Sequence, residues 1–156
     1  MKRSVSFYLG LFLIGVLPLV ALNCNDVVED TANALAGTWT VSDATGLPSF
    51  TFSGTTTITF ELGDPVTTGT FTVSGGSNLP RLVANDEQVE FPSTGSFTAT
   101  IGEDDGVLSS IALDGDNDVT LSVTSLDAAG TALTFTYTGA EPKVADAGTV
   151  TVTATK

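Results

Sequence analysis

The sequence contains no histidine and one cysteine, and only five of its 156 residues are lysine or arginine. Without histidine the chain cannot build a Ser-His-Asp or Cys-His nucleophile, and it lacks the usual ligand of zinc sites. A single cysteine has no partner for an intrachain disulfide. Carboxylate, hydroxyl and backbone groups remain for chemistry, and we therefore expect a protein that is not an enzyme and that carries no resident cofactor.

Basic residues are scarce, but acidic residues are not. Eighteen Asp and Glu give a formal net charge of −13 at pH 7. Lys2 and Arg3 lie at the extreme N-terminus, so the rest of the chain keeps only Arg81, Lys143 and Lys156 against all the acids. A surface this acidic repels phosphate backbones and anionic lipid surfaces, which excludes a nucleic-acid partner. It favours solubility and leaves the binding of a divalent cation open.

The first 23 residues have the layout of an export signal. Lys2 and Arg3 precede an apolar stretch, residues 4–22, whose only ionisable group is the phenol of Tyr8. A basic segment followed by an apolar segment is typical of a signal peptide. A membrane-spanning helix is the alternative, because the apolar stretch reaches the short end of the range that a span needs. Both interpretations place the following residues outside the cytoplasm, since the basic end stays inside.

The only cysteine, Cys24, stands where this apolar stretch ends. The residues before it, Leu19-Val20-Ala21-Leu22-Asn23, resemble a bacterial lipobox, in which small and aliphatic residues precede a cysteine that is lipidated and becomes N-terminal. Asn23 stands where Gly, Ala or Ser is usual. The resemblance implies removal of residues 1–23, acyl chains such as palmitate on Cys24, and a lipid anchor in the outer membrane, on its periplasmic or cell-surface face. A free thiol is the alternative.

From Gly37 onwards, apolar residues alternate with threonine, serine or charged residues. This alternation indicates strands with one buried and one solvated face. Turn-forming segments such as Gly63-Asp64-Pro65 separate the runs about every 10–15 residues. The apolar positions predict about nine strands, around Trp39/Val41, Ile58/Phe60/Leu62, Phe71/Val73, Val89/Phe91, Phe97/Ala99/Ile101, Ile111/Leu113, Val119/Leu121/Val123, Leu133/Phe135/Tyr137 and Val150/Val152.

Short strands without a long helix predict a single all-β domain over residues 37–156. Short connections favour an antiparallel up-and-down barrel of about 8–9 strands, and a two-sheet β-sandwich fits the same pattern. Residues 24–36 are polar and then alanine-rich, which predicts a lipidated tether that leads into one or two turns of a short N-terminal helix. Residues 139–148 contain glycine, proline and aspartate and predict a loop before a last strand at 149–155.

Gly37-Thr38-Trp39 opens the first strand directly after the helical segment. This motif resembles the Gly-x-Trp start of lipocalin-like proteins, which include small lipoproteins of Bacteroidota. The resemblance implies an eight-stranded barrel whose base Trp39 closes, with a late basic residue packed over it; Lys143 and Lys156 are the candidates. It also implies a cavity for a small apolar ligand, lined by Trp39, Phe60, Phe71, Phe97, Phe135 and Tyr137. A compact sandwich would fill that space with the same side chains.

Acidic residues are densest in Asp114-Gly115-Asp116-Asn117-Asp118. The alternate side-chain oxygens of Asp114, Asp116 and Asp118 can converge on a hard cation such as Ca2+. The segment is not an EF-hand, because Val119 stands at the sixth position in place of glycine. A hairpin turn explains the same residues without a metal.

The leading hypothesis is a lipid-anchored, non-enzymatic β-domain that binds a small apolar ligand or another envelope component. The first alternative is a structural or adhesive subunit of a surface fibre or outer-membrane complex, which would donate its last strand, 149–155, to a neighbour. The second is a glycoside-active enzyme with paired carboxylates, for which Glu61, Glu87 and Glu90 are available without a fixed spacing. Arg81 is expected to form a surface ion pair with an acid such as Glu90.

Overall fold

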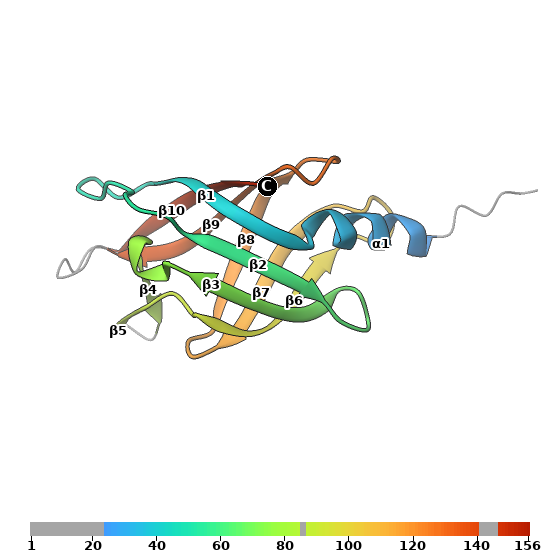
Figure 1. The fold of residues 1–156 in the computed structure, drawn as a ribbon, viewed down its shortest axis with the longest axis horizontal. Helices are drawn as coiled ribbons and strands as arrows, with labels where there is room; N and C mark the ends of the chain where they lie inside the picture. The colour runs from blue at the N-terminus through green and yellow to red at the C-terminus, as the bar shows by residue number, and fades with distance from the viewer. Residues whose placement is uncertain (1–23, 85–86, 141–146) are drawn as a thin grey trace, which may run out of the picture.

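A computed structural model describes residues 24–84, 87–140 and 147–156. The predicted signal peptide, residues 1–23, lies outside the described residues. Within the described part, no helix is both long enough and apolar enough to span a membrane. The elements in Figure 1 are α1 (Cys24–Leu35), β1 (Gly37–Thr45), β2 (Thr57–Leu62), β3 (Thr68–Ser74), a 3-10 turn (Gly76–Asn78), β4 (Arg81–Ala84), β5 (Glu87–Val89), β6 (Thr94–Ile101), β7 (Leu108–Gly115), β8 (Val119–Leu126), β9 (Ala132–Ala140) and β10 (Ala147–Thr155).

Eight strands close into one antiparallel barrel in the order β1-β2-β3-β6-β7-β8-β9-β10, and β10 pairs back onto β1. Apart from the inserted β4 and β5, strands that are consecutive in the chain are neighbours in the barrel. The predicted up-and-down barrel is therefore confirmed, and the two-sheet sandwich is wrong. The hairpin of β9 and β10 continues from Thr155↔Ala132 to Ala147↔Ala140. Gly139, Ala140, Ala147 and Gly148 of the expected loop 139–148 thus belong to this ladder, and residues 141–146 lie outside the described residues.

The last strand, β10, has a partner on each side. It pairs along its whole length with β9 and over part of its length with β1. Removing β10 would open the barrel and expose Val150, Val152 and Ala154, whose side chains are fully buried. Strand β10, which the sequence suggested could be donated to a neighbour, is thus one of the eight strands that close the barrel.

The hairpin of β4 and β5 is inserted between β3 and β6 and lies outside the closed barrel. Its strand β4 pairs with the end of β9 through Arg81↔Ala140 and Leu82↔Gly139. The sequence pattern predicted a strand around Val89 and Phe91 but missed β4, which is only four residues long. The strand β5 ends at Val89, and Phe91 turns into the core instead.

The helix α1 is longer than predicted, since it begins at Cys24 and continues for 12 residues. Asp26 lies in its first turn, where a negative charge interacts favourably with the helix dipole. Its Ala32 and Leu35 side chains are fully buried against the barrel. Figure 1 shows α1 at one end of the barrel and the β4–β5 hairpin at the opposite end.

The alternation in the sequence becomes the inside and outside of the barrel wall. On β2, Ile58 and Phe60 are buried while Glu61 is exposed. Threonine dominates the outer face, and cross-strand neighbours such as Thr38 and Thr59 place their hydroxyl oxygens 2.9 Å apart. The outer wall is thus a polar hydroxyl surface, and the apolar side chains converge inside.

Candidate functional site

The barrel interior is filled by the aromatic side chains that the lipocalin resemblance placed around a ligand. None of the six is more than 4% exposed, and the Phe60 and Phe97 rings pack edge to face with centroids 5.2 Å apart. A side chain that lines a water-sized cavity keeps accessible surface, and these keep almost none. These side chains pack together as core and leave no space for a ligand among them. The six residues are Trp39, Phe60, Phe71, Phe97, Phe135 and Tyr137.

The end of the barrel that carries α1 is closed by Trp39 and Lys156. The Trp39 indole Nε1 donates a hydrogen bond of 2.7 Å to the carbonyl of Leu35, and Lys156 Nζ donates one of 2.6 Å to the carbonyl of Ala34. Both carbonyls belong to the last turn of α1, where they lack helical partners. The Lys156 ammonium also lies 4.4 Å from the Trp39 ring centroid. Lys156 is thus the late basic residue over Trp39, while Lys143 lies outside the described residues.

Two opposing effects act on the ammonium group of Lys156. Partial burial lowers its pKa, because a charged amine loses solvation there, and the negative charge of Asp127 works in the opposite direction. The pKa of Asp127 is itself lowered, first by the hydrogen bond from the Thr131 hydroxyl and then by backbone N–H groups such as that of Ala132. The hydrogen bonds to Asp127 thus favour its charged carboxylate at this end of the barrel.

The opposite end is closed by the inserted β4–β5 hairpin. Leu79, Leu82 and Phe91 are buried there, and the Phe91 ring packs edge to face on Tyr137 at 5.5 Å. The Tyr137 hydroxyl donates a hydrogen bond of 2.9 Å to the carbonyl of Pro80. Burial raises the pKa of Tyr137, so the phenol stays neutral well beyond its ordinary range. Both ends of the barrel are thus sealed by the protein itself.

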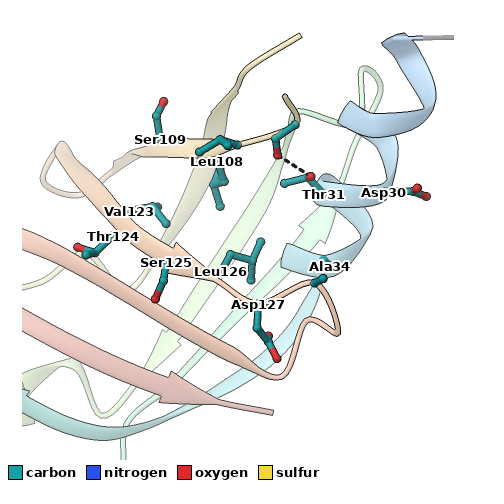
Figure 2. Close-up of a pocket in the computed structure, with 13 residues that line it drawn as sticks. Asp30, Thr31, Ala34, Leu108, Ser109, Val123, Thr124, Ser125, Leu126 and Asp127 are labelled. Atoms are coloured by element: carbon teal, nitrogen blue, oxygen red, sulfur yellow. Dashed lines mark hydrogen bonds between the residues drawn. The ribbon is translucent and has the colours of Figure 1, made fainter. Parts of the chain in front are cut away.

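A groove of about 580 Å3 opens in the barrel wall between α1 and the neighbouring ends of β7 and β8 (Figure 2). We call it the α1–β8 groove. Its size falls within the range of about 300–1,000 Å3 that is typical of ligand sites. It is lined by Asp30, Thr31 and Ala34 of α1 and by residues 106–109 and 123–128.

The groove exists because the barrel wall splits between β7 and β8. The ladder between these strands ends at Ser110↔Ser122, although β7 begins at Leu108 and β8 continues to Leu126. On its other side, β8 stays paired with β9, and a register shift between Val123 and Ser125 marks a bulge. A bulge bends and twists its strand, so the end of β8 follows β9 and leaves β7.

The helix covers one side of this split through close contacts with a glycine turn. Gly106 adopts a φ of +65°, which a residue with a side chain rarely adopts. A Cβ atom there would overlap the Val27 side chain of α1. The Thr31 hydroxyl donates a hydrogen bond of 2.7 Å to the Gly106 carbonyl, drawn as the dashed line in Figure 2. The turn before β7 is thus fixed to the middle of α1.

The α1–β8 groove combines an apolar floor with an acidic rim. Leu108 is buried and Val123 and Leu126 are half-buried, whereas Val107 at the edge is 56% exposed. Val27 and Val107 are the exposed large hydrophobic residues of the described chain, and they lie on α1 and the glycine turn that meet here. Asp30 and Asp127 line the groove, and Glu103, Asp104 and Asp105 belong to the turn that precedes Val107.

The acidic turn that suggested a calcium site lies between β7 and β8, at the far end of these strands from the groove. In the described residues, no group of three or more acidic, cysteine or histidine side chains is placed to hold a metal ion. Asp116 Oδ2 accepts a hydrogen bond of 3.2 Å from the Ser93 hydroxyl, and the Asn117 amide donates one to the Glu90 carbonyl. This geometry favours the hairpin turn over a site formed by Asp114, Asp116 and Asp118.

Arg81 and the three glutamates considered from the sequence lie on the surface. The expected ion pair is confirmed, with Arg81 Nη2 3.7 Å from Glu90 Oε1, both side chains being largely exposed. Glu61 and Glu87 are exposed and belong to different parts of the sheet, β2 and β5. Cys24 is the first residue of α1. No protein-family model and no curated protein matches the chain.

Proposed function

We propose that this protein is a lipid-anchored, non-enzymatic barrel of the bacterial envelope that binds another envelope component through its outer surface. The anchor is the acylated Cys24, exposed after removal of residues 1–23, and the outer membrane is its location. Lipocalin-like lipoproteins remain the class that the chain resembles, through Gly37-Thr38-Trp39 and the lipobox-like segment. Binding through the outer wall distinguishes this proposal from the ligand-filled barrel that the resemblance alone implies.

One observation carries the proposal: the interior is filled around its aromatic residues, and a large hollow opens in the barrel wall beside α1. The six interior aromatic residues keep almost no accessible surface, whereas the α1–β8 groove offers about 580 Å3. The groove is lined by the helix that Cys24 begins. A lipid at Cys24 would thus hold the barrel at the membrane by the end that carries the α1–β8 groove.

The anchor is tested by mass spectrometry of the full-length protein extracted from bacterial membranes, after metabolic labelling with an alkyne analogue of palmitate. We expect a mature chain that starts at Cys24, carries acyl chains and sediments with the outer membrane. Cys24→Ala should lose the label and the cleavage, because the modified sulfur is gone. An unmodified Cys24, or cleavage at another residue, would contradict the anchor. Asn23→Gly restores the usual lipobox residue and should leave the label unchanged or increase it.

A further inference from the structure

We infer that the α1–β8 groove binds an extended, cationic peptide segment of a partner protein, which adds a strand to the open edge of β8. The inference deepens the proposed function, because it names the kind of envelope component that binds and the place where it binds. Three independent features of the groove point to this occupant: an open backbone edge, an apolar floor and an acidic rim.

The open edge is the first feature. Beyond Ser122, the residues Val123–Leu126 of β8 have β9 on one side, and no described strand pairs with them on the other. On the opposite wall, Leu108 of β7 pairs with Ile101 of β6, and no described strand pairs with it on its other side. Backbone N–H and C=O groups on an open edge accept an added strand through main-chain hydrogen bonds. Four residues at about 3.3 Å each give an edge of about 13 Å.

The floor and rim are the second and third features. Side chains alternate between the two faces of an added strand, so every second side chain of the peptide would lie on Leu108, Val123 and Leu126. The intervening side chains would lie toward the rim, where Asp30 and Asp127 are. Alternating apolar and basic residues, with lysine or arginine at every second position, are the peptide chemistry that matches both features.

A second copy of this chain is disfavoured as the occupant. Pairing two copies through the open β8 edge would bring the acidic rims together, and like charges across an interface oppose association. The chain also cannot supply the cationic segment, since after residue 23 its basic residues are the isolated Arg81, Lys143 and Lys156. The partner must therefore be another protein.

The test uses the full-length protein in detergent and a fluorescein-labelled peptide of six alternating lysine and valine residues, followed by fluorescence anisotropy. We expect saturable binding that weakens as salt is raised from about 0.05 to 0.5 M, because screening weakens the charge contacts. The matching peptide of alternating glutamate and valine should not bind. Equal binding of the two peptides, or no binding of the lysine peptide, would overturn the inference.

A pair of variants on α1 locates the site. Asp30→Lys reverses a charge that lines the groove, whereas Glu29→Lys makes the same change one residue away, on an exposed side chain outside the lining. We expect Asp30→Lys to weaken peptide binding by about threefold to tenfold and Glu29→Lys to change it by less than about twofold. Equal losses in the two variants would show attraction to the overall charge and not to the groove.

Backbone methylation tests strand addition itself. Two further peptides carry N-methyl groups on all the lysines or on all the valines, which removes the N–H donors from one edge of the strand or from the other. Only the peptide methylated on the edge that faces β8 should lose binding, by at least about tenfold, because the other keeps its pairing edge intact. Unchanged binding of both peptides would exclude main-chain pairing.

The two proposals fail separately. Peptide binding needs no acyl chain, so Cys24→Ala should bind the lysine peptide as the parent does. An unlipidated Cys24 together with groove binding would remove the anchor and keep the groove. A lipidated Cys24 with no difference between Asp30→Lys and Glu29→Lys would remove the groove and leave the anchor standing.

Discussion

The two ends of the barrel are sealed in different ways. At one end, the β4–β5 hairpin packs Leu82 and Phe91 over the core, and Tyr137 bonds to the Pro80 carbonyl. The hollow beside this hairpin, next to Arg81 and Glu90, measures only about 120 Å3. At the other end, α1 lies across the opening, and polar contacts at its last turn and at a glycine turn hold it there.

This difference shows where the molecule keeps surface for binding. A hairpin whose strand β4 pairs with β9 extends the sheet at that end. A helix cannot pair with strand edges, so the split between β7 and β8 beside α1 stays open to solvent. The end that carries the proposed anchor is therefore also the end with unpaired backbone.

Trp39→Ala should destabilise the fold most, because it removes a fully buried indole that joins the core to the last turn of α1. We expect a loss of about 3–5 kcal/mol in the free energy of unfolding, measured by urea titration of the full-length protein. Trp39→Phe keeps much of the packing and loses the hydrogen bond to Leu35, so it should cost less. Equal losses in the two variants would mean that the hydrogen bond, and not the packing, closes this end.

Gly106→Ala should follow, at about 1–2 kcal/mol, because alanine is strained at positive φ and its Cβ would overlap Val27. Gly76→Ala is the matched change at the opposite end. There, a Cβ would meet its nearest neighbour, Val73 Cγ1, at an ordinary 3.4 Å, and Gly76 has no positive φ. We expect Gly76→Ala to change stability by less than about 0.5 kcal/mol. Only Gly106→Ala should also alter peptide binding in the α1–β8 groove.

Tyr137→Phe should cost about 1 kcal/mol near neutral pH, because it leaves the Pro80 carbonyl without its donor. The same variant should also change how the free energy of unfolding depends on pH. Since burial raises the pKa of Tyr137 above its unfolded value near 10, the neutral phenol contributes stability that is fully present below pH 10 and is lost as pH rises further. Urea titrations from pH 8 to about 11 should show a smaller alkaline loss in Tyr137→Phe. An unchanged alkaline loss would assign it to other groups.

The sequence was sufficient to predict most strands of the barrel, but not that the first and last strands pair to close it. Alternation such as Ile58/Phe60 and Leu133/Phe135 fixes which face of a strand is buried, and barrel and sandwich share that pattern. Closure depends on the pairing of β10 with β1, which joins residues more than 100 positions apart. Strand β4 escaped prediction because four residues are too few to show a period. The helix reaches back to Cys24 because its docking through Ala32 and Leu35 outweighs the weak local signal.

The candidate site was even less visible in the sequence. The alternation of Val119, Leu121 and Val123 continues straight through the point where β8 leaves β7, so no local pattern marks the groove. The aromatic residues that were predicted to line a cavity were correctly identified as interior, yet interior position does not distinguish lining from filling. Lys156 and Lys143 were both candidates for the position over Trp39, and only the closed barrel brings Lys156 there.

The smallest effect should come from the ion pair at the hairpin end. Arg81 and Glu90 approach to 3.7 Å, but their side chains are 42% and 70% exposed, so solvent screens the attraction and holding both side chains costs entropy. Arg81→Ala, Glu90→Ala and the double variant should each lie within about 0.5 kcal/mol of the parent, with a coupling energy near zero in the double-mutant cycle. A coupling energy above about 1 kcal/mol would show that the stability of this end, too, depends on a charged side chain. The difference between the two ends, in which only the helix end depends on a charged side chain, Lys156, would then fail.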